Sequence, residues 1–288
     1  MNDMWHIITT EVPTDHSETI AQIMYELGCN GCLEDKSEKE GIAKLTSYFD
    51  ANLFEKTPLM DDIRNVISQQ IPSSNLDMNI STSSVADWSK NWRQWFRPFE
   101  IVEDITVAPS WENFTPDEGK QVITLDPGMA FGTGLHATTM LCAKGIEKLS
   151  RTQIEPSLLD VGTGSGLLAI VARKLGLKDI MTVEIDPEAI RVAKENFSIN
   201  KTDDIEVADS ISMIDRSFDV VVANILLLTL IKLKEDLIRV TKPQGILILS
   251  GITHDQESSI EEAFAGSMNL RDINQLNEWS SITFEKKR

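Results

Sequence analysis

The stretch LLDVGTGSGLLAI, residues 158–170, joins a short apolar run, three glycines at alternate positions and a second apolar run with helical spacing. This order predicts a strand, a tight turn and the start of a helix. Glycine adopts backbone conformations that other residues avoid, and it lets a ligand approach where a side chain would block it. A dinucleotide-binding fingerprint would need its third small residue at the position of Leu167. The turn therefore predicts a different kind of ligand.

A second strand is predicted at 180–186, where an apolar run ends in acidic residues. Asp186 is a good helix N-cap and Pro187 suits the first helical position, so we expect a helix over 188–196. Glu184 lies about 20 residues beyond the first glycine, where an acidic side chain at the end of a strand can bind ribose hydroxyls. We expect ribose binding for Glu184, with a purely structural role as its alternative.

The glycine turn is similar to the Gly-x-Gly-x-Gly turn of class I S-adenosylmethionine-dependent methyltransferases. That cofactor has no pyrophosphate, so its methionine end can lie over the turn without a phosphate cradle. This similarity implies cofactor contacts from the turn, and we expect them at Gly162 and Gly164.

Further strands are predicted at 205–208, 218–223 and 245–250, and a closing pair at 270–276 and 280–285. They alternate with helices, which favours a doubly wound, mostly parallel sheet. Ligands of such sheets bind beyond the carboxyl ends of the strands.

Two polar residues stand at those predicted strand ends. Asp209 could accept a hydrogen bond from an adenine amino group, or it could simply cap a turn. Asn224 ends a continuous apolar strand. We interpret its side-chain carbonyl as an acceptor that orients an incoming amine.

A second glycine loop, DPGMAFGTGLHATT at residues 126–139, precedes a helix predicted at 138–149. Helix N-termini favour anions, so amides and hydroxyls there, Thr139 among them, could hold a cofactor carboxylate. His136 is a candidate general base, and its alternative is to order the loop.

Composition narrows the classes of protein. The 288 residues are 41% hydrophobic with a net charge of −18, which disfavours a protein that binds a phosphate backbone by itself. No apolar run reaches the roughly 18 residues of a membrane span, and the N-terminus lacks a basic signal-peptide start, so we expect a cytoplasmic protein. The three cysteines and four histidines form no disulfide framework or metal-ligand pattern.

Residues 1–80 are predicted to form a small α+β domain. Strands at 4–12, 41–49 and 76–85 and helices at 17–27 and 58–70 suggest a ferredoxin-like fold. This segment holds 5 basic and 14 acidic residues, a charge of −9. Such a surface could attract a basic protein, or it could serve solubility alone.

Residues 81–115 are predicted to connect this domain to a catalytic domain at 116–288. The segment contains four of the six tryptophans, Trp88, Trp92, Trp95 and Trp111. The first three have helical spacing, which is typical of a helix that packs an aromatic stripe on a domain.

Four motifs together resemble the bacterial ribosomal protein methyltransferases of the PrmA family, across the whole chain. They are the glycine loop through Thr139, the turn after Asp160, the Asn224-Ile-Leu sequence, and the tryptophan connector ending in Phe96-Arg-Pro. The resemblance implies a class I methyltransferase fold: α/β, Rossmann-like, with a seven-stranded, mostly parallel sheet and the small N-terminal domain. Glu184 departs from the pattern, because the family often has aspartate there.

The resemblance also implies a function. S-adenosylmethionine would be the cofactor, and large-subunit ribosomal protein eleven the substrate, held by the N-terminal domain and methylated on lysine or N-terminal amines. The expected cofactor contacts are Thr139, Gly162, Glu184 and Asn224, to which we add Gly164 and Asp209. Alternatives are a related enzyme acting on another basic protein, a nucleic-acid base amine methyltransferase, or a non-catalytic binding module. The second usually needs a proline pair and an aromatic residue after the asparagine, and here Ile225, Leu226 and Leu227 follow.

Overall fold

The computed structural model describes residues 4–27, 29, 31–37, 39, 41–51, 56–70, 78–84, 97–112, 114–125, 134–151 and 156–288. The chain divides into two compact units, Met1–Phe96 and Arg97–Arg288, here called unit 1 and unit 2. This boundary lies inside the segment 81–115, so the part of that segment from Arg97 onward belongs to unit 2. Trp88, Trp92 and Trp95 lie outside the described residues. Among the helices described, none is long and apolar enough to cross a membrane.

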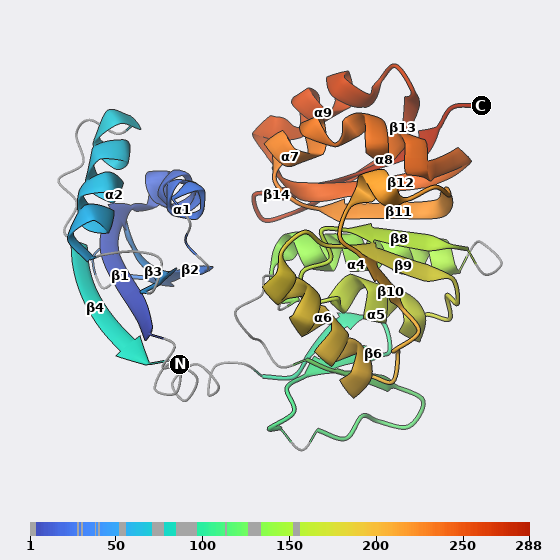
Figure 1. Ribbon diagram of the computed structural model, residues 1–288, viewed down its shortest axis with the longest axis horizontal. Coiled ribbons are helices and arrows are strands. Elements are labelled where there is room, and N and C mark those ends of the chain that lie inside the picture. Colours follow the sequence, from blue (N-terminus) through green and yellow to red (C-terminus); the bar gives the residue numbers. More distant parts are fainter. Residues whose placement is uncertain are drawn as a thin grey trace. The chain divides into compact units, whose positions relative to one another are not determined.

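The described part of unit 1 forms a four-stranded sheet with two α-helices (Figure 1). Its sheet has the order β2-β3-β1-β4 with antiparallel neighbours, which is the ferredoxin-like arrangement predicted from the sequence. Strand β2 was not predicted, because its sequence GCLEDK has no alternation of apolar and polar residues. The elements are β1 (Met4–Pro13), η1 (Thr14–His16), α1 (Ser17–Glu26), β2 (Gly31–Lys36), β3 (Ile42–Asp50), α2 (Lys56–Gln70) and β4 (Met78–Ser84).

The core of unit 1 lies between one face of its sheet and the two helices. Alternate residues of the strands, such as Ile8 and Leu45, are fully buried there against Ile20 of α1 and Ile63 of α2. This pattern is what the period-2 strands and period-3.6 helices of the sequence predict.

Unit 2 contains a seven-stranded sheet with the order β10-β9-β8-β11-β12-β14-β13. The first five of these run parallel to one another, and β14 is antiparallel to both of its neighbours. The predicted mostly parallel, seven-stranded sheet is therefore confirmed. The strands are β8 (Leu158–Val161), β9 (Ile180–Val183), β10 (Glu206–Ala208), β11 (Phe218–Asn224), β12 (Thr241–Thr253), β13 (Met268–Leu276) and β14 (Trp279–Lys286).

Helices cover both faces of this sheet (Figure 1). Val221 and Leu247 face a core shared with α7, α8 and α9, whereas Ile248, the next residue of β12, lies against Gly145 of α4. The helical elements are α4 (Ala137–Ser150), α5 (Leu167–Lys174), α6 (Pro187–Ile199), η2 (Ile211–Met213), α7 (Leu227–Lys232), α8 (Lys234–Val240), η3 (His254–Gln256) and α9 (Glu257–Phe264).

A small sheet of β5 (Phe99–Val102), β6 (Ile105–Ala108) and β7 (Gln121–Thr124) completes unit 2. Its strands are only four residues long and were not predicted. The side chain of Asn200 joins β7 to the end of α6, because it donates to the carbonyl of Thr124 at 2.7 Å and accepts from the amide of Thr124 at 2.9 Å.

Candidate active site

The chain leaves β8 through a turn in which three glycines have positive φ, namely Gly162 at 73°, Gly164 at 55° and Gly166 at 82°. Side-chain-bearing residues rarely adopt this conformation. The amides of Gly162 and Thr163 donate to the carbonyl of Val183 at 2.8 and 3.1 Å, which ties the turn to the end of β9. Gly166 is then the N-cap of α5. The predicted strand, glycine turn and helix are therefore present.

Glu184 follows β9 and holds the same turn through its side chain. Its Oε2 accepts a hydrogen bond from the Gly164 amide at 3.0 Å, and its Oε1 accepts from the amides of Ile185 at 2.8 Å and Asp186 at 3.1 Å. A carboxylate has about four acceptor positions. A ribose hydroxyl would thus use the remaining position or replace one amide, and ribose binding by Glu184 stays a prediction.

Asp186 has the structural role expected from the sequence. Its Oδ1 accepts from the Glu188 amide at 2.9 Å and caps α6, in which Pro187 is the first residue.

Asp160, the third residue of β8, is a buried acid for which the sequence indicated no role. Asp160 is only 1% exposed, and its Oδ2 accepts a 2.6 Å hydrogen bond from Thr163 Oγ1. Burial, reinforced by the charge of Glu184, raises the pKa of Asp160 to about 7, although the Thr163 hydrogen bond opposes this shift. The available signal was an acid inside an apolar strand directly before the glycine turn.

Asn224 and Thr139 come from distant parts of the sequence and meet at the carboxyl end of β11. Asn224 Nδ2 donates to Thr139 Oγ1 at 3.3 Å, and Thr139 lies in the first turn of α4. Asn224 Oδ1 is buried and has no hydrogen-bond partner among the described residues. Such an oxygen costs about 1–3 kcal/mol unless a donor reaches it, so it is a candidate acceptor for a ligand N–H.

His136 is the N-cap of α4. Its Nδ1 accepts from the Thr138 amide at 3.4 Å and lies 2.7 Å from Thr138 Oγ1. Its ring contacts Trp279 edge-on at a centroid distance of 4.6 Å. Burial lowers the pKa of His136, against a smaller opposing effect of Glu278. These contacts favour the loop-ordering role over that of a general base.

The remaining candidate, Asp209, lies beyond β10 at the same edge of the sheet and is exposed. The neighbouring backbone joins it to the site, because the Glu184 amide donates to the carbonyl of Ala208 at 3.0 Å. Contact of Asp209 with adenine stays a prediction. Most of the second glycine loop, residues 126–133, lies outside the described residues.

The structure thus gathers the candidate residues at one edge of the sheet. Gly164 contacts Glu184, Asn224 contacts Thr139, and Gly162 lies beside the residue after Asn224. The strands that carry them are neighbours, since β8 lies between β9 and β11. A turn with three glycines, acidic groups suited to a sulfonium cation, and an acceptor with no donor among the described residues fit S-adenosylmethionine beside an amine.

A Rossmann-like sheet of this order, with the glycine turn after its central strand and an acid after the next strand, defines a class I S-adenosylmethionine-dependent methyltransferase. Residues 4–287 match the family model of ribosomal protein L11 methyltransferase (PrmA). The chain belongs to this family of S-adenosylmethionine-dependent protein methyltransferases, as the resemblance of its motifs predicted.

Known proteins of the same kind match over most of their length. The ribosomal protein L11 methyltransferase of Geobacter metallireducens is 35% identical over 302 residues, covering 99% of both chains. That of Caldicellulosiruptor bescii is 32% identical over 303 residues, covering 98% of this chain and 99% of the relative. The crystal structure of ribosomal protein L11 methylase from Lactobacillus delbrueckii subsp. bulgaricus superposes with a TM-score of 0.63 and 34% identity, covering 67% of this chain and all of that one.

Proposed function

We propose that this protein transfers methyl groups from S-adenosylmethionine to amines of ribosomal protein L11, namely lysine side chains, the N-terminal α-amine or both. Membership of the family over residues 4–287 supports ribosomal protein L11 as the substrate. The observation that carries the chemistry is the buried Oδ1 of Asn224, which has no donor among the described residues. The next residue, Ile225, lies against Gly162 of the glycine turn.

Asn224 would act by orientation. When bound, S-adenosylmethionine supplies an electrophilic methyl group on a sulfonium. Methyl transfer is an in-line displacement, so the amine must present its lone pair along one direction. Asn224 Oδ1 can accept one N–H of a neutral amine, and Thr139 fixes the Asn224 amide by accepting from its Nδ2. This arrangement aligns the acceptor without covalent participation of the protein.

The acceptor must lose a proton before it reacts. A lysine has a pKa near 10.4 and an α-amine one near 7.7–8.0, so the α-amine deprotonates more readily at neutral pH. Since the pKa of His136 is lowered and its Nδ1 caps α4, His136 is a weak candidate for the base. The amine can instead lose its proton to water before it binds, and this deprotonation needs no base from the protein.

The proposed role of unit 1 is to hold the basic substrate protein. Residues 1–80 carry 5 basic and 14 acidic residues, half of the net charge of −18. Asp61 and Asp62 of α2 are exposed and contribute to this charge. Opposite charges steer association and are weakened by salt. Direct binding of nucleic acid is not part of the proposal, and the expected location is the cytoplasm, where ribosomal proteins are made.

The decisive experiment is transfer of label from methyl-labelled S-adenosylmethionine. The enzyme is incubated with purified ribosomal protein L11, with whole-cell protein extract, and with ribosomal RNA free of protein. We expect label in L11 and in one small basic band of the extract. Label in another protein or in RNA would overturn the substrate assignment and favour the corresponding alternative.

A charge-reversal pair tests the role of unit 1. Asp61→Lys/Asp62→Lys should raise KM for L11 roughly tenfold at low salt, the scale of one to two surface charge interactions. The matched control is Asp203→Lys/Asp215→Lys, which makes the same charge change on exposed residues where strands of unit 2 begin. An equal rise in KM for both pairs would mean that overall charge, and not unit 1, governs recognition.

A further inference from the structure

Ile225, the residue after Asn224, lies between a glycine that follows β8 and a glycine within β12. Gly162 follows β8 and has a φ of 73°, and Gly251 lies within β12 and has a φ of 85°. Gly251 was not singled out in the sequence, and Ile225 was noted only as part of the Asn224-Ile-Leu motif. Their positions matter because Asn224 can orient an amine only if its own backbone is fixed.

The two glycines leave no room for a side chain. A Cβ atom on Gly162 would lie 2.5 Å from Ile225 Cγ2. A Cβ atom on Gly251 would lie 2.5 Å from the carbonyl oxygen of Ile225 and 2.8 Å from its carbonyl carbon. The first contact is with a β-branched side chain, which is stiff at χ1, and the second is with the backbone itself.

Hydrogen bonds of the neighbouring Ser250 fix the position of Gly251 in β12. The Ile225 amide donates to the carbonyl of Ser250 at 3.2 Å, and Ser250 Oγ donates to the carbonyl of Ser280 at 2.7 Å. The pairing of β12 with β14 shifts register between Leu249 and Ile252, so Ser250 and Gly251 form a bulge. Bulges beside active sites commonly redirect a neighbouring side chain.

We propose that Gly251 is a positioning residue for methyl transfer. By allowing the backbone of Ile225 to approach β12, it sets the direction of the Asn224 side chain, while Gly162 limits Ile225 from the other side. This inference rests on the role of Asn224 in the proposed function.

The test separates this contact from the general strain of positive φ. Gly176 has a φ of 96° and nothing within 4 Å of its Cβ position, so Gly176→Ala brings comparable backbone strain without the contact. In single-turnover methylation of L11 at saturating cofactor, Gly251→Ala should be roughly ten- to a hundredfold slower than wild type. Gly176→Ala should keep the wild-type rate. Cofactor affinity, measured by calorimetric titration, should change less than threefold in Gly251→Ala.

A rescue experiment distinguishes the contact of Gly162 with the Ile225 side chain from the contact of Gly251 with the Ile225 backbone. Ile225→Ala removes Cγ2, so Gly162→Ala/Ile225→Ala should recover much of the rate that Gly162→Ala loses. The same Ile225→Ala change should not rescue Gly251→Ala, whose contact is with the backbone. If Gly251→Ala fails to fold, the Gly162→Ala pair still tests whether Ile225 is held between the two glycines, and absence of rescue there overturns the proposal.

Asn224→Ala in the same assay separates the inference from its premise. A slow Asn224→Ala with a Gly251→Ala as fast as Gly176→Ala would overturn the positioning role and leave the proposed function intact. An unchanged rate in Asn224→Ala would overturn the role of Asn224, and Gly251 would lose its role with it. Failure of the wild type to label L11 would contradict the proposed function itself.

Discussion

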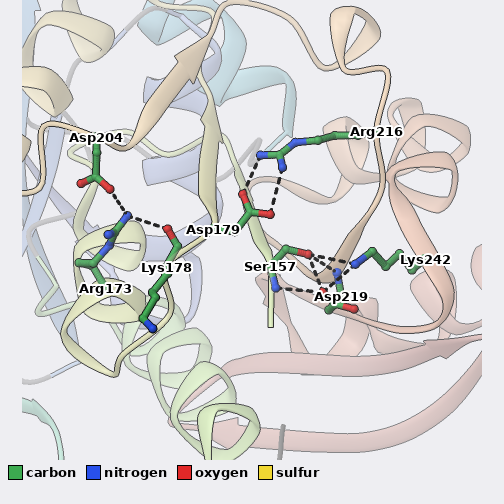
Figure 2. Close-up of polar contacts among 8 residues, drawn as sticks. All are labelled: Ser157, Arg173, Lys178, Asp179, Asp204, Arg216, Asp219 and Lys242. Atoms are coloured by element: carbon green, nitrogen blue, oxygen red, sulfur yellow. Dashed lines mark hydrogen bonds and ion pairs between the residues drawn. The ribbon is translucent and has the colours of Figure 1, made fainter. Parts of the chain in front are cut away.

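The parallel strands of the seven-stranded sheet begin at one edge, here called the paired edge, and end at the other, the carboxyl edge. The polar groups at these two edges differ in their hydrogen bonding. Where the parallel strands begin, charged side chains form ion pairs, as Figure 2 shows, although Arg173 Nε is buried without a hydrogen-bond partner among the described residues. Arg216 donates to both carboxylate oxygens of Asp179 at 2.9 and 3.0 Å, and Arg173 pairs with Asp204 at 2.8 Å. Where the strands end, Asn224 Oδ1 is buried without a partner among the described residues.

Backbone positions with positive φ occur at both edges, and where the strands begin they include Lys201 at 58° and Gln244 at 62°. At the carboxyl edge, four glycines with positive φ are concentrated in the turn after β8 and in the bulge of β12. Large apolar side chains are also exposed there, including Ile185 at 79% and Leu228 at 72%. A buried acceptor without a partner among the described residues and exposed apolar groups both reduce stability, and such features persist where function needs them. We therefore propose that the carboxyl edge carries the chemistry, while the ion pairs of the opposite edge contribute to stability.

The largest effect should follow from removing the unsatisfied acceptor. Asn224→Ala should lower the single-turnover methylation rate by roughly ten- to a thousandfold, because alignment contributes much of the rate of a displacement. Cofactor affinity should fall by less, and stability should change little, since loss of the Asn224–Thr139 hydrogen bond is offset by removal of a buried oxygen that has no donor among the described residues. Asn269→Ala, an exposed amide on β13, is the control. Single-turnover kinetics at saturating cofactor separates the effects, and a full rate in Asn224→Ala would erase the distinction between the edges.

The sequence predicted the carboxyl edge better than the paired edge. Glycine spacing placed the turn, and Asp186-Pro187 placed the start of α6, because both depend on local backbone preferences. Contacts between distant residues were not predictable, since nothing local in Thr139 indicates that it receives a hydrogen bond from Asn224, 85 positions away.

The same reasoning explains the elements that were missed. Strand β2 and the short strands β5 to β7 have little periodicity of their own, and their pairing with other strands determines them. The roles of Glu184 show a further limit. The sequence indicated an acid at a strand end, but only the folded chain shows that it accepts from three backbone amides.

Asp160 provides a pH-dependent test of the carboxyl edge. Burial raises its pKa to about 7, so its contribution to stability is full below the unfolded pKa near 3.9 and is lost as pH rises to 7. Relative to Asp160→Asn, the wild-type free energy of unfolding should fall by about 1.4 kcal/mol per pH unit within that window. Denaturant unfolding of both proteins at pH 5, 6, 7 and 8 measures the difference, which should level off above pH 7. A constant difference would show that Asp160 is ionised in the folded protein throughout.

The smallest effect is expected at the paired edge, where Asp219 joins three strands. Its Oδ2 accepts from the Ser157 amide at 3.0 Å, from Ser157 Oγ at 2.6 Å and from Lys242 Nζ at 2.8 Å (Figure 2). Partial burial opposes the charge of Asp219, but the hydrogen bonds from Lys242 and Ser157 outweigh it and lower its pKa.

Asp219→Ala should therefore reduce the free energy of unfolding by about 1–2 kcal/mol at pH 7, a value discounted because the Asp219 and Lys242 side chains are 37% and 42% exposed. The deficit should narrow as pH falls below about 4, because protonation of Asp219 removes the same interactions from the wild type. The exposed Asp215, replaced by alanine, is the control at this edge. The methylation rate at saturating substrates should be unchanged in both variants. A slower Asp219→Ala that is still fully folded would mean that the paired edge also governs the chemistry, and that stability and function are not divided between the two ends of the strands.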